Sequence, residues 1–167
     1  MAEKILLVNE VSEDSDVIVE GIAATSYELL CELNNTSKVF FEFHEKPVVA
    51  IYNLKGSFSN YEKFFAEKRL RCPMATVVFV NRAGKEEIEQ AVKAGVHALI
   101  VNGLQSSRIP AILDTAIYRF EEEQKRELAL IKARQSLEDR KVIERAKGIL
   151  MDVQNMKEND AYTSLRK

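Results

Sequence analysis

The chain has 167 residues, of which 46% are hydrophobic, enough for one substantial core and a small second domain. Its formal net charge of -2 excludes nucleic-acid binding through bulk positive charge, so any such surface must be a local patch. Cys31 and Cys72 lack metal-type spacing and are predicted to be reduced core residues. No apolar run is long enough to cross a bilayer, and the amino terminus enters a strand without a signal peptide, so we expect a cytoplasmic protein.

Short apolar runs alternate with amphipathic segments along the first two thirds of the chain. The runs have the length of β-strands, and the segments between them carry apolar residues at helical spacing. Strands are predicted at 4–8, 27–33, 48–52, 75–80 and 97–101, and helices at 14–24, 34–45, 59–70, 84–94 and from 108 onward. This alternation predicts an α/β fold, a doubly wound five-stranded parallel sheet with helices on both faces.

Two of these predicted helices carry recognisable end signals. The helix at 59–70 is expected to begin with Ser59 or Asn60 as its cap and to bury Phe64, Phe65 and Leu70 on one face. The helix at 84–94 is expected to end at a glycine cap, Gly95. The helix at 34–45 is the weakest prediction, because its aromatic content does not follow helical spacing.

No glycine or proline interrupts residues 111–147, which predicts one long helix or two nearly continuous ones. Apolar residues recur along it at spacings of three and four, as is typical of a helical pairing seam. This stripe consists of Leu113, Ile117, Phe120, Leu128, Ile131 and Val142. We therefore favour a homodimer through the helix at 108–136 over a monomer whose helix folds back on its own sheet.

The stretch at 137–151 has one apolar helical face and one charged, mostly basic face. Gly148 lies within this helix, where glycine costs about 1 kcal/mol relative to alanine. Its presence indicates that something approaches the backbone there. A nucleic-acid phosphate and a tightly packed neighbouring helix explain it equally well.

The string AKGILM at 146–151 follows Arg140 and 142–144 and precedes 160–162 and 165–166, and this arrangement resembles the signature of the ANTAR domain. That family consists of small helical RNA-binding modules of bacterial transcription antiterminators, usually placed after a response-regulator receiver. The family's domain continues for about one more helix, so we expect the module at 137–167 to be incomplete at its carboxyl end.

The resemblance implies an RNA-binding surface that uses basic side chains and stacking. The implied RNA-binding residues are Arg140, Lys147 and Gly148 in the first helix and Tyr162 and Arg166 in the second, with Lys141 and Arg145 adding attraction for the RNA backbone. For Tyr162, packing in a small helical core is as good an interpretation as stacking on a base.

Four predicted strands end in polar residues at positions that resemble the CheY-like receiver of response regulators. These residues are Asn9 and Glu10, Asn53, Asn81 and Asn102. In a working receiver the same places hold an acidic pair, the phosphoacceptor aspartate, a serine or threonine, and a lysine. The domains expected are a receiver-like domain at 1–119, a helical coiled-coil linker at 120–136 and the ANTAR module at 137–167.

The chemistry that a receiver needs is missing from these positions. Phosphoryl transfer requires a carboxylate nucleophile, a metal held by further carboxylates and a cation facing the phosphoryl group. Asn53 offers an amide, Glu10 is the remaining acid of the pair, and Asn102 carries no charge. The sequence therefore predicts a pseudo-receiver with no catalytic residue, metal or cofactor. Its asparagines either satisfy one another or form a rim for a partner protein or small ligand, as in AmiR-type regulators held by a sensor protein.

These observations predict a non-enzymatic transcription antitermination regulator of the ANTAR class that binds stem-loops in messenger RNA leaders. Its degenerate receiver would be controlled by a regulatory partner or ligand. The alternative is a protein-interaction adaptor with little RNA affinity of its own. A phosphorylated response regulator is disfavoured by Asn53.

Overall fold

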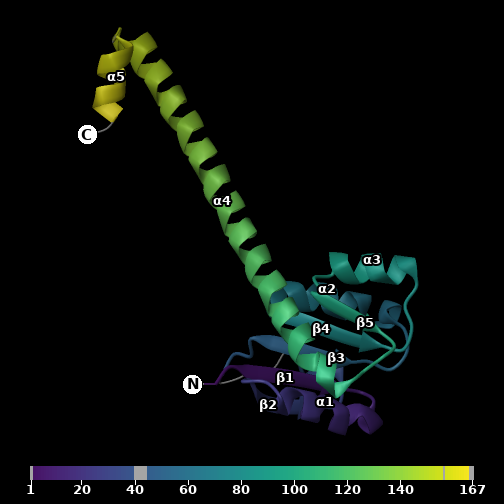
Figure 1. Cartoon of the computed structure of the whole chain (residues 1–167). Coiled ribbons are helices and arrows are strands. Elements are labelled where there is room, and N and C mark those ends of the chain that lie inside the picture. The colour runs from purple at the N-terminus through teal and green to yellow at the C-terminus, as the bar shows by residue number, and fades with distance from the viewer. Residues whose placement is uncertain (1, 40–44, 156, 166–167) are drawn as a thin grey trace. The chain divides into compact units, whose positions relative to one another are not determined.

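The computed structural model describes residues 2–39, 45–155 and 157–165 (Figure 1). Within them the chain forms five β-strands, which are β1 (Lys4–Asn9), β2 (Glu28–Leu33), β3 (Val49–Asn53), β4 (Ala75–Val80) and β5 (Ala98–Val101). The α-helices are α1 (Ser15–Ala23), α2 (Glu62–Arg71), α3 (Lys85–Lys93), α4 (Ile109–Gln154) and α5 (Glu158–Leu165). Short 3-10 turns are η1 (Ser12–Asp14), η2 (Thr36–Lys38), η3 (Phe58–Tyr61) and η4 (Ser106–Arg108).

The chain divides between Glu122 and Glu123 into two compact units. The first unit holds the sheet, α1, α2, α3 and the beginning of α4. The second unit holds the remainder of α4 and α5. Helix α4 is continuous across the division, as the absence of glycine and proline from 111–147 led us to expect.

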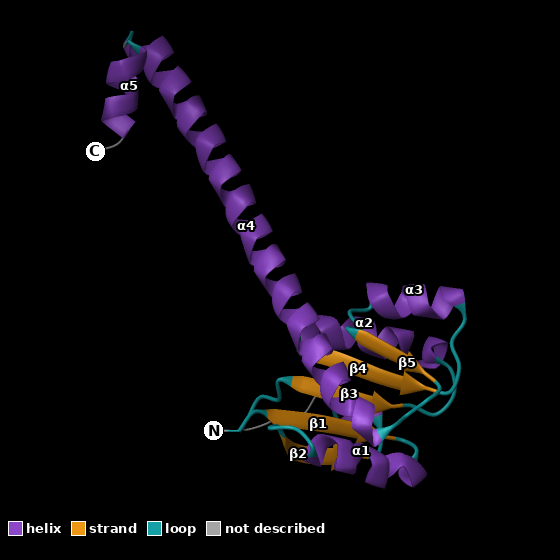
Figure 2. Cartoon of the chain, viewed as in Figure 1, coloured by secondary structure: helices purple, strands orange, loops and turns teal. Residues whose placement is uncertain are grey.

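The sheet of the first unit is parallel throughout, with strand order β2-β1-β3-β4-β5 (Figure 2). Strand β3 is buried along its whole length, because it pairs with β1 on one side and β4 on the other and side chains cover both faces of the sheet. The order is that of a doubly wound flavodoxin-like sheet, in which ligands bind at the carboxyl ends of the strands. The predicted fold class is confirmed.

Alternate residues of the strands supply two separate cores, one on each face of the sheet. Leu6, Tyr52 and Val78 face α2 and α3, where Phe65 and Ala91 pack on them. Ile5, Ile51 and Val77 belong to the opposite core, together with Ile18 of α1 and Ile109 and Leu113 of α4. The first residues of the predicted pairing stripe, Leu113, Ile117 and Phe120, therefore pack against the sheet.

Helix α1 lies directly against the start of α4. A Cβ added to Gly21 would stand 2.7 Å from Cβ of Ile109, closer than packed carbon atoms approach. Glycine therefore permits the close contact between α1 and the first turn of α4, both within the first unit.

Some predicted details are wrong. Within residues 34–39 the predicted helix is replaced by a 3-10 turn, η2 (Thr36–Lys38), and residues 40–44 lie outside the described residues. Helix α2 begins after η3 and makes no side-chain cap hydrogen bond, so neither Ser59 nor Asn60 caps it. Leu70 is 85% exposed, since it lies on the opposite side of α2 from Phe64 and Phe65. Cys31 and Cys72 are free thiols, and both are only half-buried.

The second unit is a helical hairpin. Asn155, with φ of 51°, ends α4, and the backbone carbonyl of Lys157 accepts hydrogen bonds from the amides of Asp160 and Ala161 as α5 begins. Ala161 of α5 is fully buried. In the described part of the chain no helix combines the length and the apolar character needed to span a membrane.

Candidate functional site: an amide cavity and a basic helix

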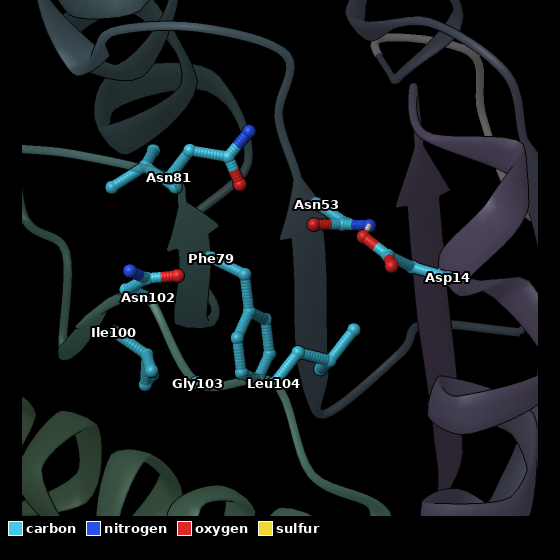
Figure 3. A pocket seen from close by; sticks show the side chains of 9 residues that line it. Asp14, Asn53, Phe79, Asn81, Ile100, Asn102, Gly103 and Leu104 are labelled. Carbon is cyan, nitrogen blue, oxygen red and sulfur yellow. Dashed lines mark hydrogen bonds between the residues drawn. The ribbon is translucent and has the colours of Figure 1, made fainter.

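The carboxyl ends of the central strands bring the predicted asparagines together. Asn9 and Asn53 are register partners on β1 and β3, and Asn81 and Asn102 follow the last residues of β4 and β5. Asn53, Asn81 and Asn102 line one cavity of about 280 Å³ at this edge of the sheet (Figure 3). We call it the amide cavity. Its wall and floor also include apolar side chains, among them Phe79 and Leu104.

Two hydrogen bonds hold the side chain of Asn53, the residue predicted to correspond to the phosphoacceptor of a receiver. Its amide nitrogen Nδ2 donates to Oδ1 of Asn9 at 3.0 Å and to Oδ2 of Asp14 at 2.9 Å. The residue is only 4% exposed. In Figure 3 the amide nitrogen points to Asp14 and the carbonyl oxygen points the other way, toward Asn81 and Asn102.

Asp14 was missed as a site residue by sequence reasoning, which placed it in an acidic first helical turn. It ends η1, and this turn brings its carboxylate back over the end of β3. The nearest signal in the sequence is its position a few residues after β1, in the loop that follows the first strand. That signal does not specify which of Ser12, Glu13 and Asp14 turns inward.

Asn9 and Glu10 lie outside the lining of the amide cavity. Asn9 donates to Oε1 of Glu32 at 3.1 Å, and the carboxylate of Glu10 accepts a hydrogen bond from the hydroxyl of Tyr61. Burial and the hydrogen bond to Glu10 raise the pKa of Tyr61 well above its ordinary range. The phenol therefore stays protonated and remains a donor to Glu10 at neutral pH.

These contacts decide whether the site fits the magnesium ion that a receiver binds. A hard cation needs several oxygen ligands that are free to turn toward it. Of the described residues that line the cavity, only Asp14 has a carboxylate, and Glu10, outside the lining, accepts a hydrogen bond from Tyr61. The residues present do not fit a magnesium ion, and Asn53 provides an amide where an acyl phosphate would require a carboxylate.

Lys147, one of the predicted RNA-binding residues, is engaged within the hairpin of the second unit. Its ammonium nitrogen lies 2.9 Å from carboxylate oxygens of both Glu144 in α4 and Glu158 in α5, and its side chain is 15% exposed. The hydrogen bonds to Glu158 and Glu144 raise the pKa of Lys147. We call this trio the lysine clamp, because it links the last turns of α4 to the first turn of α5.

The other basic side chains of the segment face solvent. Arg140, Lys141 and Arg145 are exposed, and Lys141 pairs with Glu138 at 3.0 Å. Lys141 and Arg145 are seven and three residues before Gly148 and lie on its side of the helix. A Cβ added to Gly148 would meet nothing within 4 Å, so helix packing within this chain does not explain the glycine.

The remaining predicted residues lie in or beyond α5. Tyr162 is partly exposed, next to the buried Ala161, and Arg166 lies outside the described residues. The exposed side chain of Tyr162 is compatible with a partial role in packing and with contact to a bound molecule.

Comparison with solved structures shows that the first unit shares the fold of receiver domains. A CheY-like receiver domain protein from Methanospirillum hungatei JF-1 is 16% identical with a TM-score of 0.58, over 74% of this chain and 99% of that chain. A response regulator from Thermotoga maritima is 14% identical with a TM-score of 0.59, over 71% and 99%. A response regulator receiver protein from Pseudoalteromonas atlantica is 10% identical with a TM-score of 0.58, over 69% and 97%. At such identities the likeness establishes the fold.

The first unit therefore has the fold of CheY-like receiver domains. Residues 132–167 match the model of the ANTAR domain. The chain therefore joins the fold of a CheY-like receiver to a segment that matches the ANTAR domain, the two parts that the sequence predicted. A comparison with curated protein sequences gave no match.

Proposed function

We propose that this chain is a cytoplasmic, non-enzymatic transcription antitermination regulator that binds structured nascent RNA through its ANTAR segment. The observation that carries the proposal is the face of α4 formed by Lys141, Arg145 and Gly148. It combines two exposed cationic side chains with the uncovered backbone of a glycine, Gly148. Such a face suits the phosphate backbone of a folded RNA, whose affinity for proteins comes largely from basic side chains.

The test is titration of a leader RNA with paired stem-loops against the chain and its variants at several salt concentrations. Lys141→Glu and Arg145→Glu should each weaken binding and reduce the slope of log affinity against log salt by about 1. Gly148→Ala should also weaken binding, while raising helix stability by about 1 kcal/mol. Unchanged affinity in all three variants would contradict the proposal and favour the adaptor that acts through its receiver.

Arg126→Glu provides the matched control, because Arg126 is an exposed arginine of α4 outside the ANTAR segment. Lys147→Glu is a poor probe of RNA binding. It would place three carboxylates together in the lysine clamp and loosen the hairpin whether or not RNA touches Lys147.

The proposal includes a homodimer formed through the helix at 108–136. Beyond the part of α4 that packs on the sheet, Leu128 and Ile131 are 58% and 44% exposed at the spacing of a pairing seam. Sedimentation velocity should give a dimer for the parent chain and a shift toward monomer for Ile131→Glu. The exposed Lys132→Glu is the control, and equal sedimentation of parent and Ile131→Glu would refute this seam.

We further propose that the receiver domain is controlled by a ligand or partner in place of phosphorylation. The contacts of Asn53 support this proposal, since its amide is engaged by Asn9 and Asp14. Incubation with acetyl phosphate and magnesium should leave the mass of the chain unchanged, and a base-labile phosphoryl adduct would contradict the proposal.

A further inference from the structure

In the amide cavity, the side chain of Asn53 offers an acceptor to a ligand and no free donor. Asn53 uses both N–H bonds of its side chain on Asn9 and Asp14, and these are its side-chain hydrogen bonds among the described residues. Its carbonyl oxygen is thereby left facing the cavity (Figure 3). A carbonyl oxygen that faces a cavity can accept a hydrogen bond from a donor that enters it.

The charge of the cavity has one sign. Of the described residues that line it, Asp14 alone carries an ionisable side chain. One oxygen of its carboxylate accepts the hydrogen bond from Asn53, which leaves the second oxygen for another donor. Among the lining side chains this carboxylate repels an anion and attracts a cation, although the guanidinium of Arg108 lies close to Gly103 of the lining.

The volume of the cavity and its apolar lining residues restrict the size and shape of the cation that it can bind. A volume of about 280 Å³ is at the lower limit of ligand pockets, which span about 300–1,000 Å³. Phe79, Ile100 and Leu104 offer apolar surface beside the polar groups. Asn81 and Asn102 add two more side-chain amides at the opposite side, each with an oxygen that can accept a hydrogen bond (Figure 3). The lining therefore matches a compact molecule with several N–H donors and a short apolar tail.

We propose that the amide cavity binds a small primary alkylammonium compound, with the Asp14 carboxylate as counter-ion and the Asn53 carbonyl oxygen as acceptor. An ammonium group has three donors and no acceptor, which complements these oxygens. The proposal deepens the ligand control proposed above and depends on it only for its regulatory meaning. Binding itself requires only the cavity.

Isothermal titration of the whole chain with n-propylammonium chloride at constant ionic strength tests this proposal. The size of the ligand limits the expected affinity to about millimolar. Propyltrimethylammonium has the same charge without N–H donors, 1-propanol lacks the charge, and propionate reverses it. Binding of n-propylammonium should exceed that of each comparator by at least about 10-fold, the value of a charged hydrogen bond.

Asp14→Asn should weaken binding of n-propylammonium by about 10-fold or more, because it removes the counter-ion and keeps the shape. Asp16→Asn, an exposed neighbour on α1, should bind like the parent. In the parent chain, n-propylammonium should shift the NMR resonances of the Asn53, Asn81 and Asn102 side-chain amides. Equal binding of propyltrimethylammonium, or shifts confined to residues outside the cavity, would overturn the proposal even if Asp14→Asn failed to fold.

The same samples separate this proposal from the RNA-binding one. If the parent chain binds leader RNA but not n-propylammonium, the cavity proposal alone is overturned. Intact n-propylammonium binding in a chain that binds no leader RNA would overturn the antitermination proposal alone.

Discussion

Asn53→Asp is expected to lower the free energy of unfolding by about 3–5 kcal/mol at pH 7, although it restores the residue of a working receiver. Asn53 donates to Asn9 and Asp14 from a position that is 4% exposed. An aspartate has no N–H to donate and would bring a second buried carboxylate against that of Asp14. Urea unfolding followed by circular dichroism measures the loss.

The loss should depend on pH in a defined direction. Burial and the Asp14 carboxylate would raise the pKa of the new carboxyl in the folded state above about 3.9, its ordinary value. The folded state would then bind more protons than the unfolded state, so stability falls as pH rises above about 4. The deficit relative to the parent should therefore be smallest in acid and largest near neutral pH.

A paired exchange isolates the donor–acceptor contact. In Asn53→Asp combined with Asp14→Asn, an amide again faces a carboxylate and the net charge equals that of the parent. The pair should recover about 2 kcal/mol of the loss, with the rest due to the contact with Asn9. Asn81→Asp, the same chemical change at an exposed residue, should stay within about 0.5 kcal/mol of the parent. A stable Asn53→Asp chain would refute the assigned role of the amide.

The fold was predictable because the strands are buried on both faces and read as continuous apolar runs. The run 4–8 became β1 and 75–80 became β4 with almost no change. The prediction of a helix at 34–45 was poor because the apolar residues there follow neither the helical nor the strand period consistently. The described part of it forms a 3-10 turn, a local structure that periodicity does not specify.

The candidate site was predictable only where residues end strands. Asn53, Asn81 and Asn102 were found because parallel strands align their carboxyl ends at one edge of the sheet. Asp14 was missed because its position depends on the path of η1. The lysine clamp was missed for a similar reason. The approach of Glu158 to Lys147 depends on the turn at Asn155, whose positive φ has no periodic signal.

A buried lysine also escaped sequence analysis, although its spacing contained the signal. Lys68 lies four residues after Phe64 and three after Phe65, so it shares their face of α2. Only 3% of it is exposed. Its ammonium nitrogen donates to the hydroxyl of Thr76 and lies 3.3 Å from the carbonyl oxygen of Met74. Burial lowers the pKa of Lys68 from its ordinary value of 10.5 to about 7.

This depressed pKa predicts that stability rises with pH across neutral and mildly alkaline conditions. Between pH 7 and 10.5 the unfolded chain carries a proton on Lys68 that the folded chain releases, so raising the pH favours the folded state. At about 1.4 kcal/mol for each pKa unit, burial of the charge costs up to about 5 kcal/mol below pH 7. The ring of Tyr52, with its centroid 5.9 Å from the nitrogen, favours the ammonium form and makes this figure an upper bound.

Lys68→Met should therefore be more stable than the parent at pH 6.5, and its advantage should shrink by up to about 3 kcal/mol by pH 9.5. Methionine fills a similar volume, and Thr76 keeps its own hydrogen bond to the carbonyl of Met74 at 3.0 Å. Lys63→Met, at an exposed position of α2, should show no such change with pH. Unfolding curves in urea at each pH measure the difference. Parallel pH profiles for the parent and Lys68→Met would contradict this prediction. They would mean that Lys68 keeps its proton in the folded chain. The Thr76 hydroxyl, the Met74 carbonyl and the Tyr52 ring would then offset the cost of its burial.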